Sequence, residues 1–227
     1  REVDFRISVI PTSFGEKAAL RVLDTSQATL DIDKLGFSEY CVCLLKKAAS
    51  VPHGMILVCG PTGSGKTTTL YSMLKFVGKP DRNLVTVEDP VEYQLIGVNQ
   101  VTVHPEIGLT FASALRSILR QDPDVIMIGE IRDFETVDMS IKSALTGHLV
   151  LSTLHSTTAA GAIARLVNMG VEPYLINSSL ICTVSQRLVR RICPHCREQY
   201  VMSRETAEGL KIKPDGGEFR FFRGKGC

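Results

Sequence analysis

The glycine-rich run CGPTGSGKTTT at residues 59–69 constrains the fold of this chain more than any other feature. It follows an apolar run at 55–59 and precedes a helical pattern, so the glycines fall in a loop between a buried strand and a helix. The spacing GxxxxGKT is that of a phosphate-binding loop, in which backbone N–H groups curl around a phosphate in conformations that a Cβ would hinder. The expected nucleotide-binding residues are Gly60, Pro61, Thr62, Gly63, Ser64, Gly65, Lys66, Thr67 and Thr68.

The residues at the end of this loop suit a nucleoside triphosphate and its metal ion. Lys66 would reach the β and γ phosphates, and the Thr67 hydroxyl would ligate Mg²⁺. The following helix would direct its N-terminal partial charge at the anion. A chance glycine turn is the alternative, but the strand and the helix on either side match the context that the motif requires. ATP and Mg²⁺ are therefore the expected ligands.

Strand and helix patterns alternate along the chain. Apolar runs predict strands at 55–59, 84–87, 125–128 and 149–154, and helical spacing predicts helices at 38–49, from the loop to about 77, at 111–121 and at 136–144. Parallel neighbours need crossover connections, so this alternation predicts an α/β fold with a mostly parallel sheet and helices on its faces.

The first predicted helix has a recognisable start and an apolar stripe. Ser38 is the expected N-cap. Cys41, Leu44, Leu45 and Ala48 recur at three- and four-residue spacing, which predicts that they form the buried face.

Polar side chains come directly after the predicted strands. Ligands of open parallel sheets bind beyond the carboxyl ends of the strands, so we expect these residues to lie together at the edge that carries the glycine loop. They are Glu88, Asp89 and Glu92 after the strand at 84–87, Glu130 and Arg132 after the strand at 125–128, and His155 after the strand at 149–154.

Glu130 is the first of these residues to which a role can be assigned. Phosphoryl transfer to water requires a positioned water, a metal ion and positive charge near the γ phosphate. Glu130 ends an apolar strand, as a Walker B acid does, and we assign it to Mg²⁺ and to water positioning. Gly129 stands where an aspartate is usual, so this strand lacks the residue that usually ligates the metal directly.

The remaining polar residues leave alternatives open. Glu88, Asp89 and Glu92 are all candidates for orienting or deprotonating the attacking water, and the sequence does not choose among them. His155 either senses the γ phosphate or is a structural histidine. His148 and His155 bracket one strand, and seven residues at about 3.3 Å each separate them by roughly 23 Å, which excludes a metal pair. A structural or interface role for His148 follows.

Arg116 and Arg120 share one face of the helix predicted at 111–121, at four-residue spacing. A solvated cationic face is the simpler interpretation. The alternative is that an arginine completes the site of a neighbouring subunit.

Charge and cysteine content limit the other classes of function. Residues 1–186 carry 16 basic and 19 acidic groups, whereas residues 187–227 carry 10 basic and 5 acidic ones. The basic tail contains no aromatic interleaving that would favour nucleic acid, so a solvated face is preferred. Seven cysteines, an odd number, indicate a reducing compartment instead of a disulfide framework. No apolar run approaches the length of a membrane span.

Four motifs together resemble the motor ATPases of type II secretion and type IV pilus assembly, the GspE/PilB group. The glycine loop reads GPTGSGKTTTLY, and TVEDPVEY is similar to the Asp box of that family. LRQDPDVIMIGEIRD is similar to its Walker B segment and TGHLVLSTLHST to its His box. The resemblance covers nearly the whole chain.

This resemblance implies a domain organisation and a site. It implies a RecA-like P-loop ATPase core at 37–190, preceded by the end of a small α+β, PAS-like domain with its linker at 1–36 and followed by a helical, cysteine-bearing tail at 191–227. The chain would then be a C-terminal ATPase fragment. Arg21 becomes a candidate for approaching the nucleotide. The Asp-box and His-box roles would fall on Glu88, Asp89, Glu92, His148 and His155, which for His148 conflicts with the strand-length argument.

The resemblance also implies partners and a location. Members act as homo-hexamers whose ATP-driven domain rotations drive an inner-membrane platform that builds a pseudopilus or a pilus. The expected location is the bacterial cytoplasm, peripheral to the inner membrane.

The tail contains CPHC, with Cys193 and Cys196 two residues apart, and the last residue is Cys227. Zinc prefers four thiolate or imidazole ligands, and such a pair supplies half of one site. Members of the secretion and pilus-extension type carry a second pair, of which Cys227 would be the first residue, so the resemblance implies Zn²⁺ in the full-length protein. A redox dithiol and unrelated structural thiols are the alternatives.

Three classes of function therefore compete. The favoured one is an ATP-hydrolysing motor. A nucleotide-gated scaffold with little turnover, or a pilus or DNA-uptake relative of the same superfamily, is the runner-up, and a nucleic-acid module led by the basic tail comes last. Phosphate release and salt-sensitive DNA binding distinguish them.

Overall fold

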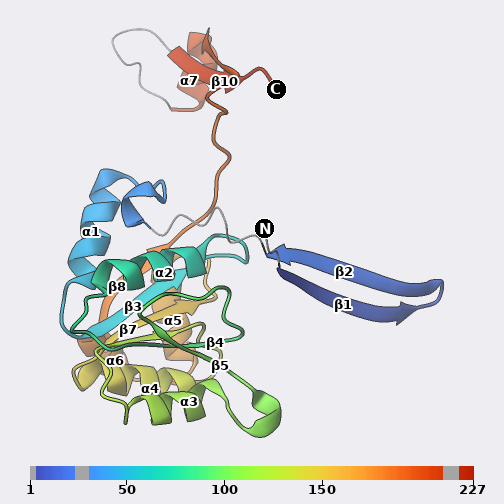
Figure 1. Cartoon of the computed structure of the whole chain (residues 1–227). Coiled ribbons are helices and arrows are strands. Elements are labelled where there is room, and N and C mark those ends of the chain that lie inside the picture. Colours follow the sequence, from blue (N-terminus) through green and yellow to red (C-terminus); the bar gives the residue numbers. More distant parts are fainter. Residues whose placement is uncertain (1–3, 24–30, 212–219) are drawn as a thin grey trace. The chain divides into compact units, whose positions relative to one another are not determined.

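A computed structural model describes residues 4–23, 31–211 and 220–227, which are coloured in Figure 1. The chain divides into two compact units, Arg1–Arg187 and Leu188–Cys227. The expected organisation into 1–36, 37–190 and 191–227 stays a prediction.

The centre of the first unit is a six-stranded sheet, counted over the described residues, with the order β5-β4-β6-β7-β3-β8. All of the strand pairs within it are parallel. The predicted α/β fold with a mostly parallel sheet is confirmed. The strands are β3 (Gly54–Cys59), β4 (Leu84–Glu88), β5 (Asn99–Thr102), β6 (Val125–Ile128), β7 (Leu149–Leu154) and β8 (Leu180–Ser185).

Helices cover both faces of this sheet (Figure 1). One core cluster joins the sheet to η1, α1 and α2, and another joins its opposite face to α3, α4, α5 and α6. Every residue of β3, β4, β6 and β7 is buried, as expected where helices pack on both sides. The helices are η1 (Ile32–Lys34), α1 (Glu39–Ala49), α2 (Lys66–Val77), η2 (Pro105–Ile107), α3 (Phe111–Ile118), α4 (Phe134–Leu145), α5 (Ala159–Asn168) and α6 (Pro173–Ser179).

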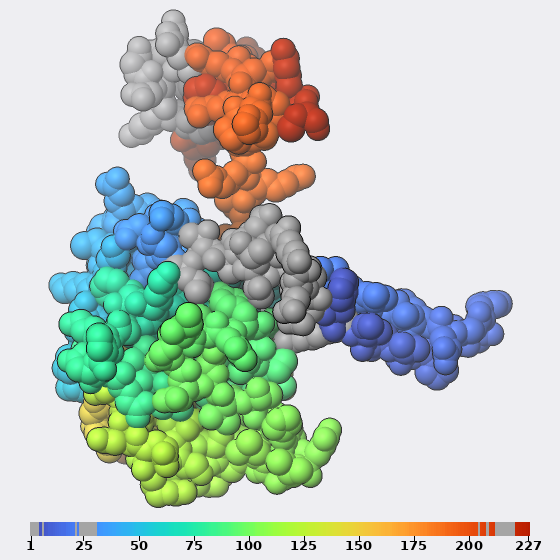
Figure 2. Space-filling view, viewed as in Figure 1, coloured from blue at the N-terminus to red at the C-terminus, as the bar shows by residue number. Residues whose placement is uncertain are grey.

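Helix α1 starts where the sequence predicts but buries a different face. The Ser38 hydroxyl accepts a hydrogen bond from the N–H of Cys41 at 3.3 Å, which confirms the N-cap. Val42 and Leu45 are buried, whereas Cys41 and Leu44 are exposed, so half of the expected face is wrong. Two overlapping stripes have helical spacing here, and packing on α2 and η1 selects the one that contains Val42. The outer side of α1 lies at the surface of the unit (Figure 2).

The helix expected to run to residue 121 ends at Ile118. The N–H of Arg120 donates to the carbonyl of Ser117 at 3.1 Å, which is the tighter spacing typical of a last turn. Asp122 has a φ of 50° and precedes Pro123, so the chain leaves the helical conformation there. Arg120 therefore lies beyond the helix, and the expected shared helical face with Arg116 is wrong.

Several elements were not predicted. No element was assigned from the sequence to the segments that form β5, α5, α6 and β8, although the apolar residues of α5 do recur at helical spacing. The extended opening segment forms an antiparallel hairpin of β1 (Asp4–Thr12) and β2 (Gly15–Leu23), with Phe5 opposite Val22.

The second unit contains less helix than expected for the tail. Its described residues form the antiparallel strands β9 (Arg197–Val201) and β10 (Arg220–Gly224) and the short helix α7 (Arg204–Gly209). Exposed and partly buried residues alternate along β9, which is a period for a strand and not for a helix.

Candidate functional site

The glycine loop lies between the end of β3 and the start of α2. Three of its glycines have backbone angles in the region that favours glycine: φ is 149° at Gly60, 78° at Gly63 and 85° at Gly65. Gly65 is the N-cap residue of α2. The loop therefore adopts the curled backbone that the motif predicts, and only glycine takes up these angles without strain.

Gly60 and Gly63 are glycines for different reasons. A Cβ on Gly60 would lie 2.5 Å from the carbonyl oxygen of Gln186 and 2.6 Å from Ser64 Oγ. A Cβ on Gly63 would meet no atom within 4 Å. Space and backbone angle both require glycine at position 60, whereas at position 63 only the backbone angle does.

The side chain of Lys66 folds over the loop. Its Nζ donates hydrogen bonds to the carbonyl oxygens of Gly60 and Pro61, each at 3.0 Å. Burial lowers the pKa of Lys66, and the charge of Glu130 acts in the opposite direction. The ammonium group thus lies at the loop, within the electrostatic reach of Glu130.

The first turn of α2 contributes backbone donors to the same place. The first N–H groups of a helix have no partner within the helix. In α2 these belong to Lys66, Thr67 and Thr68, directly after a cap residue that has no side chain. Such an end attracts anions. Ligation of Mg²⁺ by Thr67 stays a prediction.

Charged side chains from three strand ends form a chain of contacts at this edge of the sheet. Asp89 follows β4, Glu130 and Arg132 follow β6, and His155 follows β7. Arg132 lies 2.5 Å from Glu130 and 3.8 Å from Asp89, and His155 Nε2 lies 3.4 Å from the other oxygen of Glu130. The hydrogen bond to Glu130 raises the pKa of the Arg132 guanidinium. The structure thus links Asp89 to Glu130 through Arg132, to which the sequence had assigned no role, and places His155 on the other oxygen of Glu130.

Gly129, which stands where an aspartate is usual, packs closely against β4. Its N–H donates to the carbonyl of Val87 at 2.8 Å, so β6 runs close beside β4 at this point. A Cβ on Gly129 would lie 3.3 Å from Glu88 Cα and 3.4 Å from the Val87 oxygen. A side chain at position 129 would therefore be in tight contact with the backbone of β4.

Glu88 differs from its neighbour Asp89 in its surroundings. Glu88 is buried, and its carboxylate accepts hydrogen bonds from Tyr71, from Thr86 at 2.5 Å and from Gln100 at 3.1 Å. Burial of Tyr71 is the largest cause that raises the pKa of its hydroxyl, and its hydrogen bond to Glu88 is the second. Glu88 therefore ties α2 and β5 to the end of β4, whereas Asp89 is exposed. Glu92 lies further along the loop and is partly buried.

His148 lies away from this cluster. It precedes β7, whereas His155 follows it, so the two histidines lie at opposite ends of one strand. His148 Nδ1 lies 2.9 Å from the carbonyl oxygen of Ser143 and 3.3 Å from Thr146 Oγ1. These contacts hold the C-terminal end of α4, as the strand-length argument implied.

Arg116 and Arg120 are not part of the cluster. Arg116 forms an exposed ion pair with Glu135 between α3 and α4. A terminal nitrogen of Arg120 donates to Ser117 Oγ at 3.4 Å. Arg21 lies in β2, and its side chain is outside the described part of the chain. A role of Arg116 or Arg120 in a neighbouring site stays a prediction, as does the approach of Arg21 to the nucleotide.

Gln186 is a contributor that the sequence did not reveal. It directly follows β8, is buried, and makes side-chain hydrogen bonds to the glycine loop and to α2. Because β8 itself was not predicted, no signal in the sequence could have placed a glutamine behind the loop.

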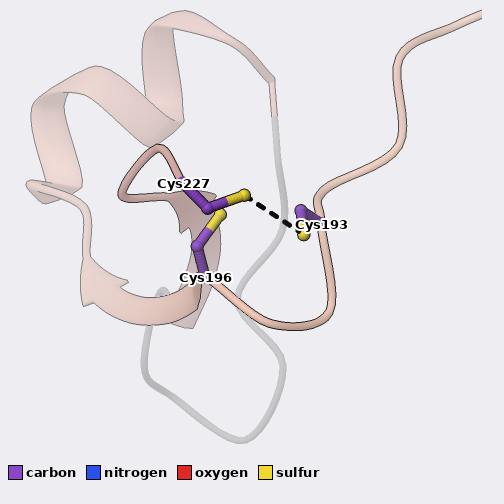
Figure 3. A group of neighbouring side chains, drawn as sticks. All are labelled: Cys193, Cys196 and Cys227. Atoms are coloured by element: carbon purple, nitrogen blue, oxygen red, sulfur yellow. Dashed lines mark hydrogen bonds between the residues drawn. The ribbon is translucent and has the colours of Figure 1, made fainter.

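Three cysteines of the second unit converge (Figure 3). The Sγ atoms of Cys193, Cys196 and Cys227 all lie within 4.8 Å of one another, and the thiol of Cys227 contacts Cys193 Sγ at 3.8 Å. Hydrogen bonds from the backbone N–H groups of His195 and then of Cys196 lower the pKa of Cys193. The hydrogen bond with Cys193 raises the pKa of Cys227. Three clustered sulfur ligands, one of which accepts backbone hydrogen bonds, fit a thiolate-binding metal ion such as Zn²⁺.

The helices in the described part of the chain are all too short or too polar to cross a bilayer.

A parallel α/β sheet with a phosphate-binding loop at its carboxyl edge defines the class of P-loop nucleotide-binding proteins. The chain belongs to the family described as Type II/IV secretion system protein, whose model matches residues 1–227.

The relatives whose names state a function are longer than this chain. It is 54% identical over 229 residues to the type IV pilus assembly ATPase PilB of Myxococcus xanthus (strain DK1622), with 100% of this chain and 40% of that protein covered. It is 50% identical over 214 residues to the type II secretion system protein E of Klebsiella pneumoniae, with 94% and 43% covered. The chain thus spans less than half the length of these relatives.

Solved structures share the fold. The crystal structure of the pilus retraction motor PilT with bound ADP matches with a TM-score of 0.70 and 38% identity, over 82% of this chain and 55% of that one. The ATPase DotB of Yersinia pseudotuberculosis matches with a TM-score of 0.68 and 28% identity, over 82% and 51%.

Proposed function

We propose that this chain binds Mg-ATP in the loop at residues 60–68 and hydrolyses it. The observation that carries the proposal is the position of the loop at the same sheet edge as the contacts among Asp89, Arg132, Glu130 and His155. The names of the relatives, several of which are ATPases, support it.

Each residue of the site would have a distinct task. The N–H groups of the loop and of the α2 start would hold the phosphates, with the ammonium of Lys66 moving from its loop carbonyls to the outer phosphate. Thr67 and Glu130 would hold Mg²⁺, which neutralises charge on the phosphates when bound. His155 and Arg132 would orient Glu130 through their contacts with its two oxygens.

The water-orienting carboxylate is to be sought among Glu88, Asp89 and Glu92. Because the Glu88 carboxylate already accepts three hydrogen bonds from protein groups, we infer that Glu88 holds the site together and that Asp89, exposed beside Arg132, acts on water. Loss of phosphate release in Asp89→Asn with unchanged unfolding stability supports this assignment. A parent-like rate in that variant contradicts it.

On a larger scale, we propose that the chain is the ATPase part of a hexameric motor. The relatives named for pilus assembly and type II secretion support a role in building a pilus or a pseudopilus. The motor would act on platform proteins from the cytoplasmic side of the bacterial inner membrane. In that protein residues 1–36 would end a PAS-like domain, 37–190 would form the RecA-like core and 191–227 a metal-binding tail.

We also propose that Cys193, Cys196 and Cys227 are ligands of a structural Zn²⁺, with a fourth ligand still to be identified. The convergence of the three sulfurs supports the proposal. Zinc titration followed by native mass spectrometry tests it. Binding of one ion by the parent and much weaker binding by Cys196→Ser is expected, and equal binding by both refutes this ligand set.

The decisive test of the ATPase proposal is phosphate release. Lys66→Ala and Glu130→Gln should abolish it, whereas Lys142→Ala, which removes an exposed ion pair on α4, should not. Rates unchanged in the first two variants would contradict hydrolysis at this site. Nucleotide binding without release in the parent would favour the gated scaffold. Native mass with ATP present tests the hexamer.

A further inference from the structure

The residue that follows β8 is hydrogen-bonded to both elements of the phosphate site. The N–H of Gln186 donates to the carbonyl of Cys59, the last residue of β3, at 3.0 Å. Its side-chain Nε2 donates to the carbonyl oxygen of Ser64 at 2.6 Å, and its Oε1 accepts from Thr69 Oγ1 at 2.9 Å. A buried amide that is hydrogen-bonded through both its nitrogen and its oxygen is a rigid link.

The bond to Ser64 has a geometric consequence. A peptide group is planar and trans, so the carbonyl of Ser64 and the N–H of Gly65 point in opposite directions. Gln186 approaches that carbonyl from one side, and the N–H of Gly65 is thereby directed to the other. In loops of this type such N–H groups are the phosphate donors.

The main chain of Gln186 shapes the loop as well. Its carbonyl oxygen occupies the space where a Cβ on Gly60 would lie, at 2.5 Å. The glycine loop is therefore packed from behind by residue 186, through both its backbone and its side chain.

We propose that Gln186 is a positioning residue for the phosphate site: through Ser64 it fixes the direction of the Gly65 N–H before the nucleotide arrives. The inference rests on the proposed nucleotide binding. It adds a residue that follows the edge strand β8, the neighbour of β3 in the sheet, to the residues of the glycine motif. It requires no contact between Gln186 and the nucleotide.

Two substitutions of Gln186 separate positioning from simple support. Gln186→Leu has a similar volume and removes both side-chain hydrogen bonds. Gln186→Glu keeps an acceptor for Thr69 and replaces the donor to Ser64 with a second oxygen. Thr69→Val is the matched control, because it removes the bond from α2 and leaves the one to Ser64 in place.

The experiment is a titration of the chain with a fluorescent ADP analogue, with thermal unfolding measured without nucleotide. Both Gln186 variants should bind about tenfold more weakly, the order expected when a buried hydrogen bond is lost, while Thr69→Val changes binding much less. If Gln186→Glu does not fold, Gln186→Leu carries the comparison, since it adds no charge.

The remaining outcomes overturn the inference in distinguishable ways. Folded Gln186 variants that bind like the parent refute positioning and leave the proposed ATPase intact. Equal weakening in Thr69→Val and Gln186→Leu shows that Gln186 only supports α2, which also refutes it. A parent chain that binds no nucleotide refutes the proposed function together with this inference.

Discussion

The two loop glycines at positions 60 and 63 allow a quantitative test of how the phosphate loop is packed. Gly60 and Gly63 both have positive φ, at 149° and 78°. An alanine at either position pays a backbone cost of about 1–2 kcal/mol. Only at position 60 would the new Cβ also collide, at 2.5 Å from the Gln186 oxygen and 2.6 Å from Ser64 Oγ.

The collision adds the cost of overpacking, about 1–3 kcal/mol. We therefore expect Gly60→Ala to lower the free energy of unfolding by about 2–5 kcal/mol, and Gly63→Ala by about 1–2 kcal/mol. The two variants differ by the overpacking cost of about 1–3 kcal/mol, and for a chain of this size 1 kcal/mol corresponds to about 2–4 °C in Tm. Gly60→Ala should therefore unfold roughly 2–12 °C below Gly63→Ala.

The assay is thermal unfolding followed by far-UV circular dichroism without nucleotide, with urea unfolding as an independent measure. Measuring the nucleotide-free chain keeps effects on binding out of the comparison. Equal losses for the two variants would show that the backbone angle alone requires glycine at position 60. The inferred packing of Gln186 against the loop would then be wrong.

Three further predictions follow from burial. Leu45→Ala should cost about 2–4 kcal/mol and Leu44→Ala under about 1 kcal/mol in urea unfolding, because Leu45 is 3% exposed and Leu44 is 44% exposed; the reverse order would contradict the face of α1. Glu88→Gln should lose about 2–3 kcal/mol, since an amide places N–H groups against donors, whereas Asp89→Asn should lose little; equal stabilities would contradict the buried network. Burial raises the pKa of Cys59 to about 11, so about one thiolate in a thousand is present at pH 8, and mass spectrometry should find Cys59 unlabelled by iodoacetamide while exposed thiols react.

Much of the candidate site could be predicted because it depends on local sequence and on one general property of sheets. The loop from Gly60 to Thr67 is continuous in the chain. Its glycines permit the positive φ angles of the loop, which is a local property of the backbone. Glu130 and His155 come from distant segments, but the carboxyl ends of parallel strands share one edge, so strand prediction was enough to bring them together.

Other features depend on which segments pack against one another. Glu88 and Asp89 are adjacent and alike in the sequence, yet Glu88 is buried and hydrogen-bonded to Tyr71 whereas Asp89 is exposed. Glu88 is the last residue of β4, which helices cover on both faces, and Asp89 lies beyond the end of that strand. Arg120 was expected within a helix but lies beyond its end, because Asp122 and the following proline leave the helical conformation.

The sequence by itself determined the phosphate loop, the parallel α/β class and the edge at which the charged residues meet, since periodicity and motif spacing are local properties. Only the tertiary structure decided the strand order, the buried face of α1 and the place of Gln186 behind the loop. These depend on partners far apart in the chain, and close packing selects among locally equivalent alternatives.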